Sequence, residues 1–169
     1  MKNPSFRLLS LLAAVAALSL SGCANKKNKQ YAGIDGDYVN GTPLSDRNES
    51  ANFLGSNVQR GLYAPVQFAY DSSAVAPDQA SKVEAVASAL KSSGKTVIVA
   101  GFTDERGTQE YNRSLGEKRA LAVREALLSK GLKADQVQTV SFGSEMPVDP
   151  ASNEAAWAKN RRAEFGIVK

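Results

Sequence analysis

Residues 96–102 (TVIVAGF) constrain the fold more than any other stretch, because they are almost wholly apolar. An apolar strand of this kind is typical of the centre of a sheet that is covered on both faces. Two stretches with helical spacing of their apolar residues flank it, at about residues 77–93 and 109–129. Pro77 suits the start of the first helix, and Gly94 suits its end. The pattern predicts a sheet with helices packed against it.

Three further strands and one short helix complete the pattern. The strands are predicted at residues 66–70, 138–142 and 163–167, where apolar residues alternate, and the helix at residues 153–159. The order is strand–helix–strand–helix–strand–helix–strand. Because helix crossovers favour parallel pairing of the early strands, we predict an α+β fold with a mixed four-stranded sheet packed against helices.

The first residues of the chain have the features of a secretory signal. Lys2 and Arg7 precede an apolar run from Leu8 to Leu20. The run is shorter than the about 20 residues that a membrane span needs. Leu-Ser-Gly-Cys closes it, with the chain's single cysteine at Cys23. A plain signal with a chance cysteine, or a partly buried free thiol, is the alternative. A lone secreted cysteine has no disulfide partner in its own chain, which argues against this alternative.

The Leu-Ser-Gly-Cys order resembles the bacterial lipobox, which implies a lipoprotein signal peptide over residues 1–22 and a covalent lipid on Cys23. We expect no other cofactor. Ala24 stands where many Gram-negative lipoproteins that stay in the inner membrane have aspartate, which predicts the periplasmic face of the outer membrane. Residues 23–62 show no sustained periodicity and are predicted to be an anchor and flexible linker. The folded domain is predicted over residues 63–169, with residues 52–61 left open as an added strand or turn.

Charge and composition exclude several functions. Removing residues 1–22 takes away two basic residues and no acidic one, so the net charge falls from +4 to +2. A nucleic-acid binder usually carries a dense basic stripe, and we expect no nucleic-acid partner. The chain has no histidine and no second cysteine, which excludes Ser-His and Cys-His catalysis and the usual zinc sites.

The loop at residues 103–108 (TDERGT) follows the central strand, and ligands of open α/β sheets tend to bind at this end of a strand. Asn112, Leu115 and Arg119 are spaced to share one face of the next helix. Asp104 and Arg119 on one crevice would suit a zwitterion, with its ammonium on the acid and its carboxylate on the guanidinium. The spacing equally allows Asp104 to pair directly with Arg119 or to cap the helix.

The segment as a whole resembles the OmpA-like C-terminal domain, through Thr103-Asp104, Gly107, Tyr111-Asn112, Leu115, Arg119-Ala120 and Val123. Two further stretches, FGSEMP at residues 142–147 and NEAAWAKNRR at residues 153–162, narrow the similarity. Together with the lipobox they resemble the peptidoglycan-associated lipoproteins of the Tol–Pal system. The similarity extends over residues 66–169.

The resemblance implies a non-enzymatic protein that binds the diaminopimelate of peptidoglycan and tethers the outer membrane to the cell wall. Asp104 would hold the ammonium and Arg119 a carboxylate, with Thr103 in the same motif. Asn112 and Leu115 would line the crevice. TolB and other Tol–Pal components are implied as partners, with roles in envelope integrity and cell division. A closer alternative is an OmpA-like lipoprotein that binds the wall without TolB.

Tyr70 and Asp71 match a family Phe-Asp loop whose backbone N–H groups contact the ligand. One departure is Phe102, where most members have histidine. We expect Tyr111 to be a packing residue rather than a ligand contact, and Trp157 of the short helix to fill the core. The adjacent Arg161-Arg162 could face the wall or close the domain by pairing with acids. A wall hydrolase remains a second class of function, without a histidine or thiol to assist Asp104 and Glu105.

Overall fold

The computed structural model describes residues 38–39, 42–43 and 52–169. The predicted signal peptide, the lipid site at Cys23 and most of the predicted linker lie outside these residues. Strands β1 (Tyr38–Val39) and β2 (Thr42–Pro43) pair antiparallel with each other. Within the described part of the chain, no helix has the length and apolar character that crossing a bilayer requires.

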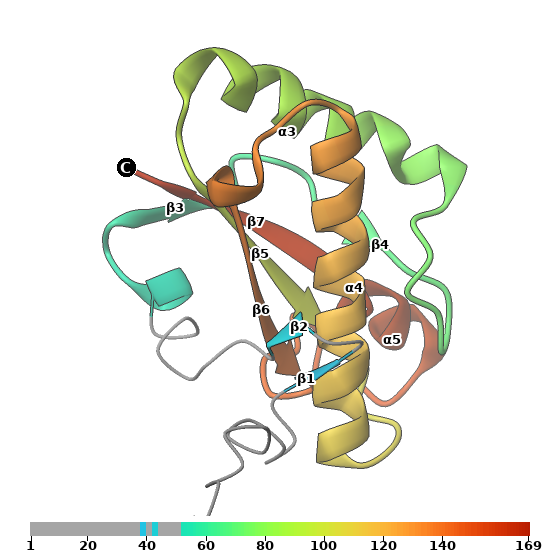
Figure 1. Cartoon of the computed structure of the whole chain (residues 1–169). Helices are drawn as coiled ribbons and strands as arrows, with labels where there is room; N and C mark the ends of the chain where they lie inside the picture. Colours follow the sequence, from blue (N-terminus) through green and yellow to red (C-terminus); the bar gives the residue numbers. More distant parts are fainter. Residues whose placement is uncertain (1–37, 40–41, 44–51) are drawn as a thin grey trace, which may run out of the picture. The chain divides into compact units, whose positions relative to one another are not determined.

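A five-stranded mixed sheet organises residues 52–169 (Figure 1). Its strands are β3 (Val58–Arg60), β4 (Val66–Gln67), β5 (Val97–Phe102), β6 (Val137–Gly143) and β7 (Arg162–Val168). The order is β3–β7–β5–β6, and β4 pairs with the other end of β7 on the same side as β3. Strands β5 and β6 are parallel, as their helical crossover predicts, and β7 runs antiparallel to its neighbours.

The sheet has one strand more than predicted, and the packed domain starts before residue 63. Strand β3 pairs with the end of β7, from Val58 opposite Val168 to Arg60 opposite Gly166. Phe53, 1% exposed, packs in the same region. Gly166 makes room for them, because a Cβ there would lie 2.6 Å from a Val58 methyl and 2.8 Å from the Phe53 ring. Residues 52–60, which the sequence left open as an added strand or turn, therefore pack as a helical turn at residues 52–54 followed by the strand β3.

The helices agree closely with their predictions. The 3₁₀ turn η2 (Pro77–Gln79) leads into α3 (Ala80–Ser93), which Gly94 ends in the left-handed conformation. Helix α4 (Gln109–Ser129) is capped by Thr108, whose side chain accepts from the Tyr111 N–H. Helix α5 (Glu154–Asn160) is capped in the same way by Asn153. A second 3₁₀ turn, η3 (Ala134–Gln136), precedes β6.

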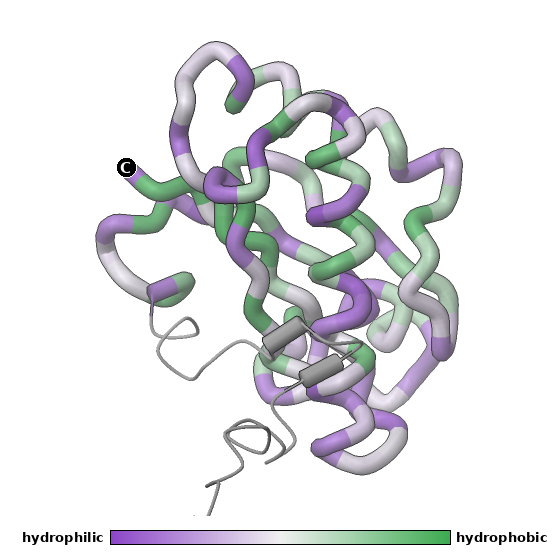
Figure 2. The backbone as a smooth tube through the Cα atoms, in the orientation of Figure 1, coloured by the Kyte–Doolittle hydropathy of each residue, from purple (hydrophilic) through white to green (hydrophobic). Residues whose placement is uncertain are grey.

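The two faces of the sheet belong to different hydrophobic clusters. Alternate residues of β5 divide between them: Val97 and Val99 face the cluster that α3 and α4 complete, whereas Ile98, Ala100 and Phe102 face a second cluster that contains Phe53. Figure 2 shows hydrophobic residues gathered on the strands and hydrophilic ones on the connecting loops. Burial on both faces explains why the β5 sequence is apolar throughout.

Two glycines bring α4 unusually close to the sheet. A Cβ on Gly101 of β5 would lie 1.9 Å from the Gly116 carbonyl oxygen of α4, and a Cβ on Gly116 would lie 2.3 Å from the Ser141 hydroxyl of β6. Neither contact leaves room for a side chain. The helix therefore lies directly on β5 and β6, and its first turns are held beside the end of β5.

Candidate functional site

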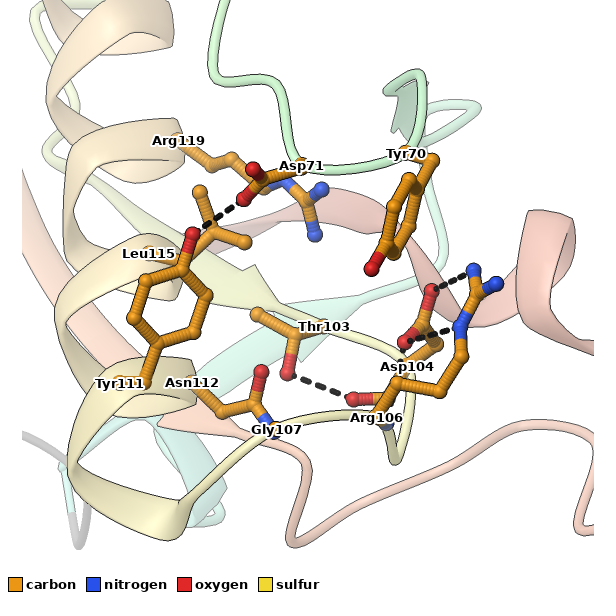
Figure 3. A pocket seen from close by; sticks show the side chains of 10 residues that line it. All are labelled: Tyr70, Asp71, Thr103, Asp104, Arg106, Gly107, Tyr111, Asn112, Leu115 and Arg119. Carbon is orange, nitrogen blue, oxygen red and sulfur yellow. Dashed lines mark hydrogen bonds and ion pairs between the residues drawn. The ribbon is translucent and has the colours of Figure 1, made fainter.

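A pocket of about 150 Å³ opens at the carboxyl end of β5, where the loop to α4 begins (Figure 3). Three segments form it: the loop after β4, the loop after β5 and the first half of α4. Its lining consists of Tyr70, Asp71, Thr103, Asp104, Arg106, Gly107, Tyr111, Asn112, Leu115 and Arg119. All seven residues predicted to bind a ligand are among these. Arg106, Gly107 and Tyr111 line the pocket as well.

Asp104 is 4% exposed and is held by two arginines. Arg106 pairs with it at 2.7 Å and Arg161 at 3.3 Å. Burial acts to raise the pKa of Asp104, but the hydrogen bonds from Arg106 and Arg161 outweigh it and place that pKa below its usual value. The carboxylate is therefore charged at neutral pH. Both simpler interpretations of Asp104 are wrong in this structure, because its ion pairs do not involve Arg119 and the cap of α4 is Thr108.

Arg119 is fully buried and joins α4 to two other backbone segments, the loop after β4 and the end of β5. Its Nε donates to the Ser72 carbonyl and its Nη1 to the Phe102 carbonyl, both at 2.8 Å, while Nη2 donates to the Ala69 carbonyl at 3.2 Å. A guanidinium has five N–H groups, so these three bonds leave two for another acceptor. Burial lowers the pKa of Arg119 to about 10, which leaves it charged at neutral pH. Its head group points into the pocket (Figure 3).

Asn112 contributes a buried donor that has no acceptor. The residue is 2% exposed, and in the described part of the chain its Nδ2 makes no hydrogen bond. An unsatisfied buried amide costs about 1–3 kcal/mol, so a native structure rarely keeps one without a reason. Since Asn112 lines the pocket, a bound polar group is the simplest acceptor for it.

The loop after β4 closes the pocket on the side of α4. Asp71 has a left-handed φ of 51°, and in the described part of the chain it is the one residue other than glycine with a positive φ. Its carboxylate accepts a hydrogen bond from the Tyr111 hydroxyl. This bond raises the pKa of Tyr111. Tyr111 is 50% exposed. The prediction that it is a packing residue was wrong, because it spans the pocket rim instead of entering the core.

The expectation for Trp157 was also wrong. Its ring is only partly buried, its Nε1 donates to Glu105 at 3.0 Å, and the Arg106 guanidinium stacks on its face, 4.0 Å from the ring centroid. Ala156 and Asn160 are the residues that α5 buries. Trp157 therefore supports the loop after β5 from outside. Arg106 could not be found by periodicity, because its partners Tyr70 and Trp157 are far away in the sequence.

Arg161 and Arg162 close the domain, the second of the two alternatives left open. Arg161 bridges Asp104 and Glu154 and donates to the Phe68 carbonyl. Arg162 pairs with Glu164 at 2.6 Å. Both arginines are buried, so neither is exposed to contact the cell wall.

Phe102 does not reach the pocket with its side chain. Its ring, 1% exposed, stacks on Phe142 at 5.2 Å between centroids, and the Arg162 guanidinium lies 3.9 Å from it. Phe102 contributes to the pocket through its backbone carbonyl, which accepts a hydrogen bond from Arg119. The described residues also contain no group of three or more His, Cys, Asp or Glu side chains placed to hold a metal ion.

A family model described as the OmpA family matches residues 67–161. These residues include the three segments that form the pocket. The fold and the pocket are therefore those of an OmpA-like domain.

Similar proteins identify the family to which the chain belongs within the OmpA-like proteins. The peptidoglycan-associated lipoprotein of Pseudomonas aeruginosa is 36% identical over 98% of this chain and 97% of that protein, and the one of Legionella pneumophila is 37% identical over the same shares. The crystal structure of the peptidoglycan-associated lipoprotein from Burkholderia pseudomallei is similar with a TM-score of 0.59 and 43% identity, over 61% of this chain and 88% of that one. The chain belongs to the peptidoglycan-associated lipoprotein family, and as a member it is a binding protein, not an enzyme.

Proposed function

We propose that the chain binds the diaminopimelate of peptidoglycan non-covalently in the pocket at the end of β5. The single observation that carries the proposal is the juxtaposition of a buried carboxylate, a buried guanidinium and an unsatisfied buried amide around one small cavity. Asp104 would take the ammonium of the free amino-acid end. Arg119 would take its carboxylate with its two remaining N–H groups.

The size of the pocket suits this kind of ligand. At about 150 Å³ it is smaller than the about 300–1,000 Å³ of a site that encloses a drug-sized molecule. It has room for the zwitterionic end of one side chain, while the rest of the stem peptide and the glycan stay outside. Leu115 supplies an apolar wall for the methylene part of that side chain.

Binding to the wall becomes a tether if the other end of the chain is in a membrane. We propose that Cys23 is lipidated and anchors the chain to the outer membrane on its periplasmic side. One pocket binds moderately, but many anchored copies on one polymer bind by avidity. A Cys23→Ser variant recovered in the membrane fraction with the same yield as the wild type would contradict the anchor.

Participation in the Tol–Pal system, and through it in envelope integrity and cell division, is the finer part of the proposal. It is supported by the names of the relatives and by the resemblance of residues 142–147 and 153–162. TolB is the expected protein partner. Pull-down from periplasmic extract distinguishes this from a wall-binding lipoprotein outside that system, since the latter would leave TolB unbound.

Selectivity between walls tests the ligand itself. Lysine in place of diaminopimelate lacks the carboxylate, so a buried Arg119 would be left without its acceptor, and polar sites reject such analogues strongly. We expect the full-length chain to sediment with diaminopimelate wall. Its affinity for lysine wall should be lower by a factor of about ten or more. Wall whose diaminopimelate carboxylate is amidated is the matched control, because it keeps the carbon skeleton and the ammonium and removes only the negative charge. It should behave like lysine wall. Equal binding to all three walls would refute the assignment.

A further inference from the structure

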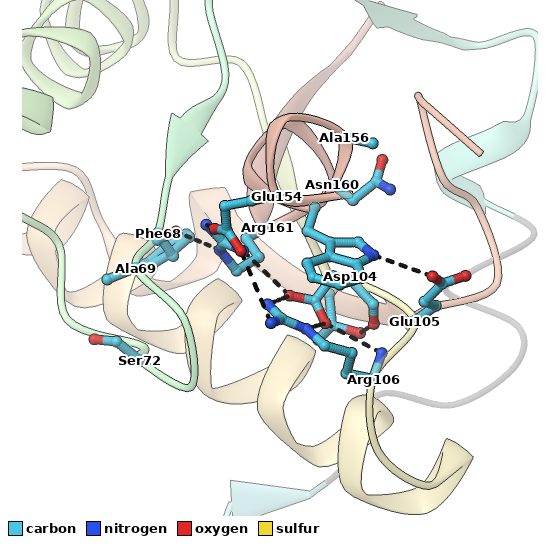
Figure 4. Close-up of polar contacts among 12 residues, drawn as sticks. Phe68, Ala69, Ser72, Asp104, Glu105, Arg106, Glu154, Ala156, Asn160 and Arg161 are labelled. Atoms are coloured by element: carbon cyan, nitrogen blue, oxygen red, sulfur yellow. Dashed lines mark hydrogen bonds and ion pairs between the residues drawn. The ribbon is translucent and has the colours of Figure 1, made fainter. Parts of the chain in front are cut away.

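The acceptor positions of Asp104 are filled by the protein itself. Its Oδ1 accepts from the backbone N–H and the Nε of Arg106, at 3.1 and 3.2 Å. Its Oδ2 accepts from Arg106 Nη2 at 2.7 Å and from Arg161 Nη1 at 3.3 Å (Figure 4). A carboxylate offers about four lone-pair positions. A ligand ammonium that approaches Asp104 therefore has to replace one of these donors.

The donor that can give way is the side chain of Arg106. Arg161 has a side chain only 7% exposed, and Glu154 at 2.7 Å and the Phe68 carbonyl at 3.1 Å hold it in place. The Arg106 N–H is part of the backbone of the loop. The Arg106 side chain is 30% exposed and reaches Asp104 from the solvent side, where water can replace its lost contacts.

Arg106 also has partners that do not depend on Asp104. Its guanidinium carbon lies 4.1 Å from the ring centroid of Tyr70 and 4.0 Å from that of Trp157. Its Nη1 lies 3.8 Å from a Glu154 oxygen. Cation–π contacts and this ion pair stabilise the guanidinium after it leaves the carboxylate, which lowers the cost of displacing it.

We propose that Arg106 is an internal cation that occupies the ammonium position of the pocket and exchanges with the ammonium of the ligand. This inference rests on the proposed function and deepens it. The exchange makes the site selective: a ligand that brings its own cation replaces Arg106 on Asp104, whereas a ligand without one leaves the Asp104–Arg106 pair intact and gains nothing from it. The exchange also lowers the affinity for the ligand, because every binding event breaks the Asp104–Arg106 pair.

Calorimetric titration of the full-length chain with a soluble disaccharide-tripeptide that ends in diaminopimelate tests the exchange. Arg106→Gln removes the competing cation and should tighten binding roughly twofold to fivefold, the range expected for a partly exposed ion pair. The same muropeptide with its ammonium acetylated should bind Arg106→Gln no more tightly than wild type. Arg124→Gln, the same change of charge on α4 outside the pocket lining, controls for net charge and should bind like wild type.

Weaker or unchanged binding by folded Arg106→Gln would overturn the exchange, and so would an equal gain for the acetylated ligand. Thermal unfolding of each variant establishes that it is folded. Failure of the wild type to bind the muropeptide would instead overturn the proposed function, so the two failures are distinguishable. Arg106→Lys, which keeps the charge without the two-pronged contact, should lie between wild type and Arg106→Gln.

Discussion

Arg119→Ala is expected to reduce co-sedimentation with diaminopimelate wall to the level of a control without wall. The variant loses the group that would bind the ligand carboxylate. It also releases the Ala69, Ser72 and Phe102 carbonyls that Arg119 now holds. The loop with Tyr70 and Asp71 then loses two of its hydrogen bonds to α4 and keeps the one between Asp71 and Tyr111. The measurement is the fraction of protein in the wall pellet, at a concentration where wild type is mostly bound.

The structure adds a cost that the motif alone does not predict. Carbonyls that lose a donor destabilise the fold by about 1–3 kcal/mol where water does not replace it, so Arg119→Ala should melt at a lower temperature while remaining folded at the temperature of the assay. Arg124→Ala is the matched control, because it removes the same side chain from the same helix outside the pocket lining. Wild-type sedimentation by a folded Arg119→Ala would disprove the role of Arg119.

Gly101→Ala is expected to have the largest effect on stability. The new Cβ would lie 1.9 Å from the Gly116 carbonyl oxygen and 2.7 Å from its carbonyl carbon, and backbone atoms cannot rotate away as a side chain can. Helix α4 would have to move off β5. We expect the free energy of unfolding to fall by about 3 kcal/mol or more, measured by chemical denaturation, and wall binding to fall because α4 carries Asn112, Leu115 and Arg119.

Gly61→Ala is the control that separates this clash from the general effect of replacing a glycine. Gly61 has a φ of +75°, and a Cβ there would meet nothing within 4 Å. The substitution should therefore cost only the about 1–2 kcal/mol of a left-handed alanine. If Gly101→Ala were no more destabilising than Gly61→Ala, the close approach of α4 to β5 would not be essential.

Local patterns were enough for most of the elements. The helix at residues 109–129 was predicted with the bounds that the structure gives, because its apolar spacing lies within a single segment. The apolar β5 and its parallel partner β6 followed from hydrophobicity and from the crossover between them. Strand β3 lies in the stretch that the sequence left open as a strand or turn, because three residues carry little periodicity and their pairing depends on β7, more than a hundred residues away.

The pocket likewise has features that the sequence determined and contacts that only the tertiary structure decided. The order of residues determined that Asp104 follows the central strand and that Asn112, Leu115 and Arg119 share a helix face, because both are consequences of backbone geometry within one segment. Only the tertiary structure decided what each charge contacts: Arg106 and Arg161 on Asp104, three carbonyls on Arg119, and Arg106 between Tyr70 and Trp157. Such contacts join side chains from separate segments, and their positions exist only after the sheet and its helices have packed.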